Sequence, residues 1–598
     1  MRSLDDTIAI QTRARALLML IVGALAACAV AYWFVQILRG PHYAELAENN
    51  QYNEGGITAP RGKVLDRSGR VILVDNRPSF NLYVVPERCE DFDRELERLS
   101  EQIELGPREL ERIARRRSRL RSFEPLLIQE DIPFEQMAYF EARADRYPWV
   151  MVAADHERAY PNGRLAAHLL GRVGEVSERQ LQVGAFSGAR PGTMVGQSGL
   201  ERRYNEVLTG EDGLFVQVVD SAGRVVREVS RETPTPGGDL LLTIDFELQR
   251  RAEELLDGRA GALVALDVRS GEVLAMASAP SFDPNSYVEL LPQLAADESS
   301  PLLNRAISSK FSPGSVWKVL IAAAALQEGI TTPERQEFCG GAVELDNRLF
   351  HCHAGAGHGW MSLVPAITHS CNIYFYKTGR RLGIERIARW ASRFGFGERT
   401  EIDLPYEVAG LVPTPEWSER VRNSPWYPSE TVSISIGQGP LEVTPLQMAV
   451  FMAAVANGGR LVQPHLVRGM RRPGGELFIF PQPPTRSVGI GDDVLRWVRE
   501  GLYGAVNRGG TAARARIPQI SIAGKTGTAQ VVRKRFGVSP EELPEEQRHH
   551  AWFVCFAPSE EPEVAVCVFV EHGGSASLSA VPLATEFLRS YAQVRAEQ

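Results

Sequence analysis

A serine and a lysine three residues apart stand just after a break in the middle of the chain. Ser315 and Lys318 follow Pro313-Gly314 and precede an alanine-rich apolar run. This pattern predicts a helix that begins at Ser315, with both side chains on one helical face. A serine hydroxyl becomes a nucleophile when a base lies within hydrogen-bond reach, and a desolvated lysine can be that base. The pair therefore indicates nucleophilic acyl transfer, although S-x-x-K by itself also describes an ordinary helix start.

A second polar segment, Ser370-Cys371-Asn372, lies between two stretches of helical pattern. Taken alone it predicts only a polar turn between helices. Beside a nucleophilic serine it has a chemical use. The Ser370 hydroxyl can pass a proton from the lysine to a leaving group, and the Asn372 amide can hold a peptide carbonyl.

The third segment follows an alternating apolar run, Ile520–Ala523, which predicts a strand. Gly524 and the glycine of the motif keep the strand surface clear, so an extended substrate can pair with its edge. The lysine and the threonines offer donors to a substrate carboxylate. The residues of the motif are Lys525, Thr526, Gly527 and Thr528.

Lys377-Thr378-Gly379 spells the same motif shortly after Ser370. It lies within Phe375–Ala391, which has helical periodicity and strong helix-forming residues. A helix offers no free strand edge to a substrate. We therefore assign the motif to Lys525.

An apolar segment, Ala16–Leu38, contains no charged residue and is long enough to cross a bilayer of roughly 30 Å. Arginines precede it, so residues 1–15 are expected in the cytoplasm and residues 39–598 in the periplasm. A cleaved signal peptide is the alternative. The length of the apolar run and the lack of a clear small-residue cleavage pattern favour an uncleaved anchor in the inner membrane.

The exported part changes in composition near residue 240. Residues 39–240 are polar and rich in Arg and Glu, and Arg108–Arg121 predicts a solvated helix. Thr233–Asp239 is a cluster of Pro, Gly and Thr that marks a domain boundary. We therefore expect a pedestal domain over 39–240 and a second domain over 241–598.

The second domain shows strand patterns at both ends and helical patterns between them, which predicts an α+β fold with an antiparallel sheet flanked by helices. The net charge of -8, without basic blocks, gives no sign of nucleic-acid binding. The expected strands are Leu240–Ile244, Ala260–Asp267, Gly271–Ala277, Ala551–Ala557 and Val564–Val570, and the expected helices are Phe246–Leu256 and Ala580–Val594.

The order S-x-x-K, S-x-N, K-T-G is that of penicillin-binding proteins and serine β-lactamases. Ala59–Arg70, Arg158–Pro161 and Gly196–Tyr204 resemble segments of the pedestal of class B penicillin-binding proteins. Ser435–Gln447 is similar to a segment of their transpeptidase domain. The chain therefore resembles this class, and Gly357-His358-Gly359 with the cysteine pattern resembles its elongation-type member, penicillin-binding protein 2.

The resemblance implies a serine β-lactamase-like transpeptidase domain that cross-links peptidoglycan stem peptides from D-Ala-D-Ala donors and is acylated by β-lactams. Ser315 would attack the donor, Lys318, kept neutral by a nearby Lys525, would take its proton, and Ser370 would protonate the leaving D-Ala. Backbone N–H groups of Ser315 and Thr528 would form the oxyanion hole. By family analogy, the polytopic SEDS-type glycosyltransferase RodA would be a partner.

Other functions remain open at this point. A division-specific class B transpeptidase is the near alternative. A β-lactam sensor without transpeptidation would share S-x-x-K and K-T-G, but several membrane spans would be expected for it. A hydrolytic β-lactamase would need a positioned glutamate and would not carry a pedestal.

Three of the seven cysteines cluster with a histidine between the first two motifs. Three thiolates and one imidazole match a closed, structural zinc site. The alternative is a disulfide between the first two cysteines, which an oxidising periplasm favours. Similar positions in some elongation-type relatives hold a metal, which favours zinc, and His351 and His353 are substitutes for the histidine ligand. The expected ligands are Cys339, Cys352, His358 and Cys371.

Overall fold

The computed structural model describes residues 2–40, 52–100, 102–103, 105–118, 120, 125–219, 225–531 and 544–597, so the expected helix end at Arg121 lies outside it. The chain forms two compact units. One consists of Met1–Pro60 and Glu211–Thr235, and the other of Arg61–Gly210 and Pro236–Gln598. The pedestal expected over 39–240 contributes to both units, and the domain boundaries drawn from the sequence stay predictions.

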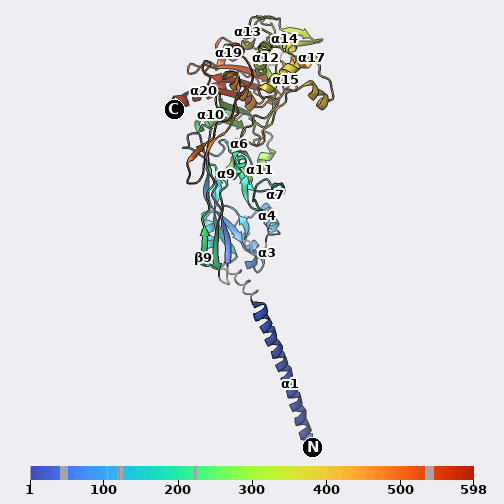
Figure 1. Ribbon diagram of the computed structural model, residues 1–598, viewed down its shortest axis with the longest axis vertical. Helices are drawn as coiled ribbons and strands as arrows, with labels where there is room; N and C mark the ends of the chain where they lie inside the picture. The colour runs from blue at the N-terminus through green and yellow to red at the C-terminus, as the bar shows by residue number, and fades with distance from the viewer. Residues whose placement is uncertain are drawn as a thin grey trace. The chain divides into compact units, whose positions relative to one another are not determined.

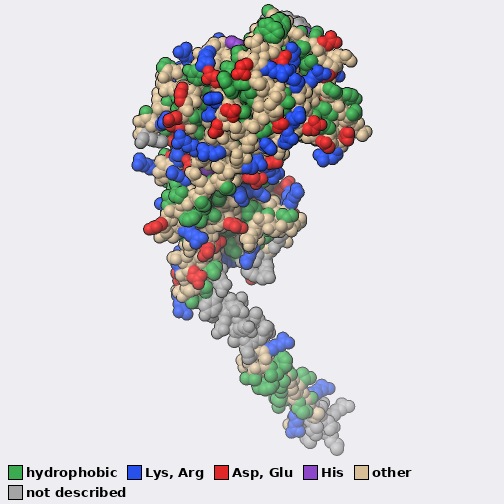
Figure 2. Space-filling view, turned by 45° about the horizontal axis from the view of Figure 1, so that its top comes forward, with side chains coloured by type: hydrophobic (Ala, Val, Ile, Leu, Met, Phe, Trp, Pro, Cys, Tyr) green, Lys and Arg blue, Asp and Glu red, His purple; other side chains and the backbone are tan. Residues whose placement is uncertain are grey.

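The first unit contains a long apolar helix, α1 (Arg2–Trp33), which continues into one π-helical turn, η1 (Phe34–Leu38). An 18-residue window within Ile10–Leu38 has a mean hydropathy of 2.3, and none of that window is buried. Figure 2 shows hydrophobic side chains gathered along this helix. The helix is therefore long and apolar enough to cross a bilayer, and helical structure begins well before residue 16, where the apolar segment starts.

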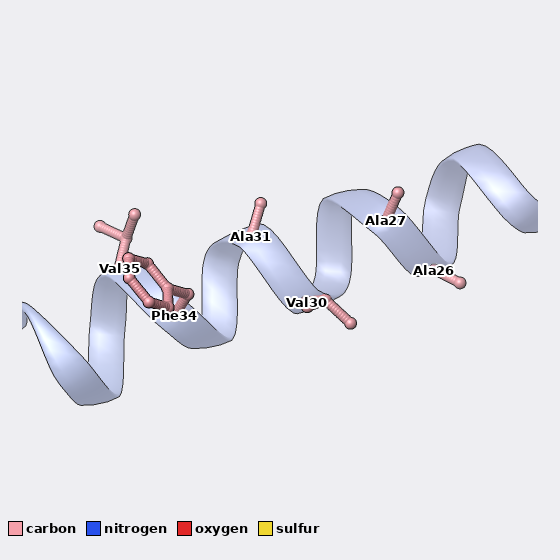
Figure 3. Close-up of a pocket in the computed structure, with 6 residues that line it drawn as sticks. All are labelled: Ala26, Ala27, Val30, Ala31, Phe34 and Val35. Carbon is pink, nitrogen blue, oxygen red and sulfur yellow. The ribbon is translucent and has the colours of Figure 1, made fainter.

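Apolar side chains of α1 and η1 line a shallow pocket (Figure 3). None of these side chains can titrate or act as a nucleophile, so the pocket is not a candidate catalytic site. The lining residues are Ala26, Ala27, Val30, Ala31, Phe34 and Val35. The same unit contains a three-stranded antiparallel sheet of order β1-β8-β9, formed by Tyr52–Ile57, Gly213–Val219 and Val225–Glu232.

The second unit contains a seven-stranded sheet of order β19-β18-β10-β2-β3-β4, in which β5 also pairs with β3. Strand β10 (Asp239–Leu242), expected over Leu240–Ile244, pairs with β2 on one side and β18 on the other. The chain therefore crosses residue 240 inside one sheet. The other strands are β2 (Val64–Leu65), β3 (Ile72–Val84), β4 (Leu126–Gln129), β5 (Val150–Ala159), β18 (Val467–Arg471) and β19 (Leu477–Ile479).

Short helices and one small hairpin surround the first part of this sheet. Helix α4 covers most of the arginine-rich stretch, and most of its charged side chains are exposed, as expected. The helices are α3 (Phe92–Ser100), α4 (Pro107–Arg117), α5 (Phe134–Glu141), α6 (Ala167–Leu170), α7 (Glu178–Gln182), α8 (Gly199–Arg203) and α9 (Asn205–Leu208), and the hairpin is β6 (Val173–Glu175) with β7 (Met194–Gly196).

The expected antiparallel sheet built from both ends of the second domain is confirmed, with the order β12-β11-β23-β22-β21. The strand expected over Ile520–Ala523 is misplaced, because β21 begins at Ala523 and contains the K-T-G motif itself. Lys525 pairs with Val554 and Gly527 with Trp552, so pairing with β22 overrides the low strand preference of lysine and glycine. The strands are β11 (Gly261–Asp267), β12 (Val273–Ala279), β21 (Ala523–Ala529), β22 (His550–Ala557) and β23 (Val564–Val570).

Helices cover both faces of this sheet, and side chains alternate between them. Leu263 packs in the core beneath α10 and α20, whereas Val264 packs in the larger core with the remaining helices. Figure 1 shows α10 and α20 close together, and they contact one another. The helices are α10 (Phe246–Leu256), α11 (Tyr287–Ala296), α12 (Lys318–Gln327), α13 (Leu363–Thr368), α14 (Asn372–Leu382), α15 (Ile384–Arg393), α16 (Pro415–Trp417), α17 (Pro428–Ile434), α18 (Pro445–Ala456), α19 (Asp492–Asn507) and α20 (Ala580–Glu597).

A small β excursion lies between α12 and α13. Strand β13 (Glu337–Cys339) pairs with β16 (Gly359–Met361), and β14 (Ala342–Leu345) pairs with β15 (Arg348–His351). A further two-stranded ladder is formed by β17 (Arg460–Leu461) and β20 (Arg486–Ser487). The excursion leads the chain from the end of the nucleophile helix to the S-x-N turn.

Candidate active site

Ser315 lies in a tight turn packed directly against the K-T-G strand. Residues Gly314–Trp317 form a 3₁₀ turn, η4, and α12 begins only at Lys318, so the α-helix expected from Ser315 starts one turn later. Gly314 has φ 58°, and a Cβ there would lie 2.4 Å from the Thr528 carbonyl oxygen. A side chain would hold the nucleophile turn away from β21, so glycine is required at this position.

Lys318 is fully buried and is surrounded by the S-x-N motif. Its Nζ donates to the Ser370 carbonyl oxygen at 2.8 Å, to Ser370 Oγ at 3.1 Å and to Asn372 Oδ1 at 2.6 Å. Burial lowers the pKa of Lys318 to about 7. A substantial neutral fraction therefore exists near pH 7, as a lysine base requires.

The S-x-N turn joins α13 to α14, as the sequence predicts. Ser370 has φ 56°, in the left-handed region, and its N–H bonds to the Ile367 carbonyl. This conformation, which serine rarely adopts, directs both the hydroxyl and the carbonyl of Ser370 at Lys318. Asn372 opens α14, and its Nδ2 donates to the His351 carbonyl at 3.1 Å, which fixes its Oδ1 toward Lys318.

Lys525 is the second fully buried lysine, and its Nζ donates to the Thr526 carbonyl oxygen at 3.1 Å. Burial lowers its pKa well below the ordinary value, and the charge of Lys318 lowers it further. The sequence argument made Lys525 the reason for a neutral Lys318. In the folded protein the cause is burial, which removes the water that would stabilise either ammonium group.

The structure thus brings all three motifs together at the edge of the five-stranded sheet. Ser315 Oγ itself forms no hydrogen bond within the described residues, although Lys318 lies one turn along the chain. Gly527 allows this close approach, because a Cβ there would lie 2.9 Å from the Pro313 carbonyl oxygen. A half-buried nucleophile therefore lies beside a desolvated base and next to the edge strand β21, which suits acyl transfer to and from an extended peptide.

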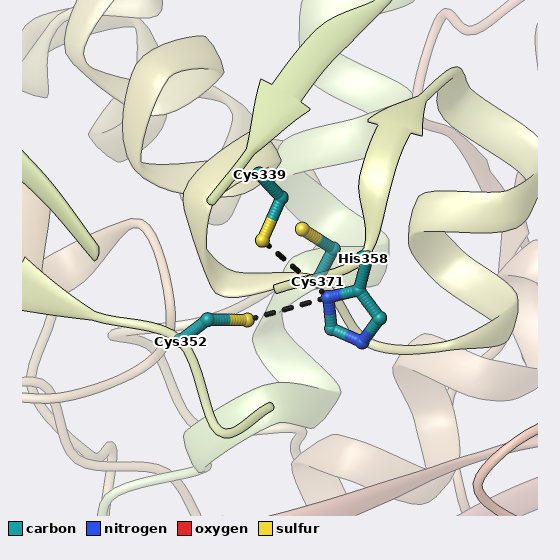
Figure 4. A group of neighbouring side chains, drawn as sticks. All are labelled: Cys339, Cys352, His358 and Cys371. Atoms are coloured by element: carbon teal, nitrogen blue, oxygen red, sulfur yellow. Dashed lines mark hydrogen bonds between the residues drawn. The ribbon is translucent and has the colours of Figure 1, made fainter. Parts of the chain in front are cut away.

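The cysteine cluster includes Cys371, the middle residue of the S-x-N motif (Figure 4). Its four ligand atoms lie within 4.8 Å of one another. His358 Nδ1 is 3.5 Å from Cys339 Sγ and 3.5 Å from Cys352 Sγ. Cys371 is the N-cap residue of α14 and adjoins Ser370 and Asn372. All of the described cysteines are free thiols.

The donor atoms of the cluster are of the types that zinc binds. Two ligands at Zn–S of about 2.3 Å and Zn–N of about 2.0 Å in a tetrahedron stand roughly 3.5 Å apart. The observed separations of 3.5 Å match that edge. A thiol–thiol hydrogen bond with Cys371 lowers the pKa of Cys352 and raises that of Cys371, so one thiolate is already favoured. The donor types and these two separations therefore fit a tetrahedral ion.

Comparison with known families accounts for nearly the whole chain. The model described as "Penicillin binding protein transpeptidase domain" matches residues 261–589, and the one described as "Penicillin-binding Protein dimerisation domain" matches residues 56–242. The first match alone spans more than half of the chain. The chain belongs to the penicillin-binding protein family.

Individual relatives agree with this assignment. The peptidoglycan D,D-transpeptidase MrdA of Acinetobacter baumannii is 34% identical over 581 residues, which are 94% of this chain and 85% of the relative. A structure entitled "Complex between Penicillin-Binding Protein (PBP2) and MreC from Helicobacter pylori" has a TM-score of 0.76 at 27% identity and covers 89% of this chain and 98% of that one. The resemblance to penicillin-binding protein 2 is confirmed, as is the α+β fold.

A second solved structure extends over almost the entire length. It is entitled "Structural coordination of polymerization and crosslinking by a peptidoglycan synthase complex" and has a TM-score of 0.71 at 32% identity, covering 97% of this chain and 98% of that one. This penicillin-binding protein is accordingly an enzyme of the serine-type transpeptidase class. The relatives named in these comparisons are transpeptidases, which favours an enzyme over the β-lactam sensor.

The second K-T-G of this penicillin-binding protein is excluded by its position. Lys377 lies within α14, where its Nζ forms an ion pair with Glu337 at 3.2 Å. The helix expected over Phe375–Ala391 is broken at Gly383, which has φ 80°, into α14 and α15. The assignment of the motif to Lys525 agrees with this geometry.

Sequence reasoning overlooked two residues that contact the K-T-G strand. Thr526 Oγ1 donates to Thr511 Oγ1 at 2.8 Å, and Gln438 Nε2 donates to the Thr528 carbonyl oxygen at 3.2 Å. Thr511 stands in a Gly-Gly-Thr turn with no motif of its own. Gln438 lies within Ser435–Gln447, a segment that resembles the family in sequence, but the resemblance assigned no function to Gln438.

Proposed function

We propose that this penicillin-binding protein cross-links peptidoglycan stem peptides during cell elongation through an acyl-enzyme on Ser315. The observation that carries this proposal is the contact of the buried Lys318 ammonium with Ser370 Oγ and Asn372 Oδ1, beside the nucleophile turn. This contact supplies a base, a proton relay and a substrate-orienting amide at one place.

Acylation follows from this arrangement. Ser315 Oγ bonds to the carbonyl carbon of the penultimate D-Ala and gives its proton to neutral Lys318. The N–H groups of Ser315 and Thr528 hold the oxyanion, while the hydroxyls of Thr526 and Thr528 hold the terminal carboxylate. The peptide C–N bond breaks, and the leaving D-Ala amine takes a proton from Lys318 through Ser370. An acceptor amine then attacks the ester, and Ser315 recovers its proton.

Covalent labelling tests the nucleophile. The full-length chain in detergent is expected to gain the mass of one penicillin, located on the peptide that contains Ser315. The Ser315→Ala variant is expected to gain none, and Ser312→Ala, three residues earlier in the chain, is the matched control. A stable adduct on Ser315→Ala would contradict the assignment. Formation of a cross-linked dimer of stem peptides, rather than hydrolysis alone, distinguishes a transpeptidase from a sensor.

We also propose a structural zinc ion bound by the cysteine cluster. The supporting observation is that the four donor atoms lie within 4.8 Å of one another, with His358 Nδ1 3.5 Å from two of the sulfur atoms. Four protein ligands would leave no position for water. When bound, the ion would fix β13, β15 and α14 to one another, and with them the S-x-N turn. Metal analysis of the purified full-length chain is expected to find one zinc per molecule, and Cys339→Ser is expected to lose it. A Cys339–Cys352 disulfide without zinc would end this proposal.

The membrane arrangement is a further part of the proposal. Helix α1 would anchor the chain with residues 1–15 in the cytoplasm and the remainder in the periplasm, since arginines precede the apolar span. A RodA-type glycosyltransferase would be the partner, supported by the likeness to the synthase complex. A reporter fused at residue 50 is expected to be active only in the periplasm. Cytoplasmic activity would reverse the topology.

A further inference from the structure

The segment Ser435–Gly439 packs against both sides of the proposed oxyanion hole. The Gly314 N–H donates to the Gly437 carbonyl at 2.9 Å, next to the nucleophile. A Cβ on Gly437, which has φ 73°, would lie 2.2 Å from the Gly314 carbonyl oxygen. The neighbouring Gln438 reaches across to the K-T-G strand, where its Nε2 donates to the Thr528 carbonyl oxygen. One short segment therefore contacts the backbone at Gly314 and at Thr528.

The position of Thr528 makes this contact informative. Strand β21 is the edge of its sheet, so alternate residues direct their N–H and C=O groups away from β22. The Thr528 carbonyl lies against Gly314 and accepts from Gln438, so it points to the free edge. The N–H of a strand residue points to the same side as its carbonyl. The Thr528 N–H therefore also points to the nucleophile turn.

We propose that Gln438 is a positioning residue for acylation, which holds the Thr528 backbone so that its N–H and the N–H of Ser315 converge on the oxyanion. This inference rests on the proposed acyl-transfer function. Without the amide, the Thr528 carbonyl at the free edge would lack this side-chain donor, and the edge backbone could rotate. An oxyanion hole stabilises the transition state only when its donors are fixed beforehand, and a displacement of 1 Å can cost about 100-fold in rate.

The test measures acylation of the full-length chain by a chromogenic cephalosporin under stopped flow, with the active fraction set by penicillin titration. Gln438→Ala is expected to lower the acylation rate constant by about 10- to 100-fold while the dissociation constant of the preceding complex changes less than about threefold. Gln438→Glu, which keeps the shape but places an acceptor against the carbonyl, is expected to lose at least as much. Gln438→Asn is expected to recover part of the rate.

The matched control is another glutamine whose side-chain amide donates to a backbone carbonyl, but outside the active site. Gln463 Nε2 donates to the Glu401 carbonyl at 2.9 Å, outside the site, and Gln463→Ala is expected to acylate at the wild-type rate. A role in stability alone would lower the active fraction and the melting temperature but leave the rate of the active molecules unchanged. Wild-type acylation rates in both Gln438→Ala and Gln438→Glu would overturn the inference about Gln438 and leave the proposed function standing. Failure of the wild-type chain to acylate would overturn the proposed function and this inference with it.

Discussion

Two groups of buried charged side chains in the second unit meet the cost of desolvation in opposite ways. In the pedestal part, the Glu201 carboxylate is fully buried between Arg61 at 2.8 Å and Arg158 at 2.6 Å. In the active site, Lys318 and Lys525 are equally buried, yet neither forms an ion pair within the described part of the chain. The first group keeps its charges by pairing them, whereas the second has its pKa values lowered.

The pKa directions express this difference. Burial alone would raise the pKa of Glu201, but Arg158 and Arg61 outweigh it and hold the net pKa below 4.5. Burial lowers the pKa of Lys318 to about 7, and the Cys352 and Cys371 thiols only partly offset this effect. A paired buried charge keeps one protonation state, which suits a structural role. An unpaired one is ready to exchange a proton, which suits catalysis.

The largest expected effect is on the unpaired group. Lys318→Met removes the base and its three hydrogen bonds but keeps the apolar stem, so we expect the acylation rate to fall by about 10³-fold or more while the melting temperature falls only modestly. Stopped-flow acylation and thermal unfolding of the full chain measure the two quantities. A large loss of stability would mean that Lys318 serves the fold as Glu201 does.

Glu201 is expected to behave in the reverse manner. Glu201→Gln leaves two buried arginines without a countercharge, so we expect the free energy of unfolding to fall by about 3–5 kcal/mol. The acylation rate per active molecule is expected to stay at the wild-type value. Chemical denaturation and penicillin titration test both statements, and Glu211→Gln provides a comparison at an exposed glutamate. An unchanged stability would remove the structural half of the comparison.

The pH dependence sharpens the same contrast. Below a pKa of about 7, Lys318 is protonated and cannot accept the Ser315 proton, so the acylation rate is expected to fall about tenfold per pH unit on the acid side and to level off above pH 7. The stabilisation from Glu201 is present above its unfolded pKa near 4.5 and is lost only as the pH falls through its lower folded pKa. Unfolding measured between pH 5 and 8 should therefore show no change that traces to Glu201. A flat acylation profile from pH 5 to 8 would contradict the role of Lys318.

The smallest effect is expected at the second K-T-G. The Lys377 ion pair with Glu337 is partly exposed, and such pairs are worth about 0–1 kcal/mol. Lys377→Ala should therefore change stability little and leave acylation at the wild-type rate, whereas Lys525→Ala should lower it strongly. Equal effects of the two substitutions would mean that Lys377 contributes to the site as Lys525 does.

Local sequence was sufficient for the motifs and for most elements that hold them. The helix Phe246–Leu256 and the strand Val564–Val570 occur with the predicted ends, because hydrophobic period and capping residues act over a few positions. The S-x-N turn between helices and the helical setting of Lys377 followed for the same reason. Short-range pattern also indicated which of the two K-T-G copies could lie on a strand.

Only the tertiary structure decided what depends on distant parts of the chain. The strand at Lys525 runs through the K-T-G motif because β22 pairs with it. Strand β10 belongs to the sheet of β2 because the two strands pair with one another. The sequence attributed the neutral Lys318 to Lys525, whereas burial by the whole fold is the cause. Gln438 and Thr511 were missed because their partners lie on another segment, and hydrogen bonds across such separations leave no local pattern. The sequence by itself determined which side chains could react. Packing of the folded chain determined their protonation states and their orientations.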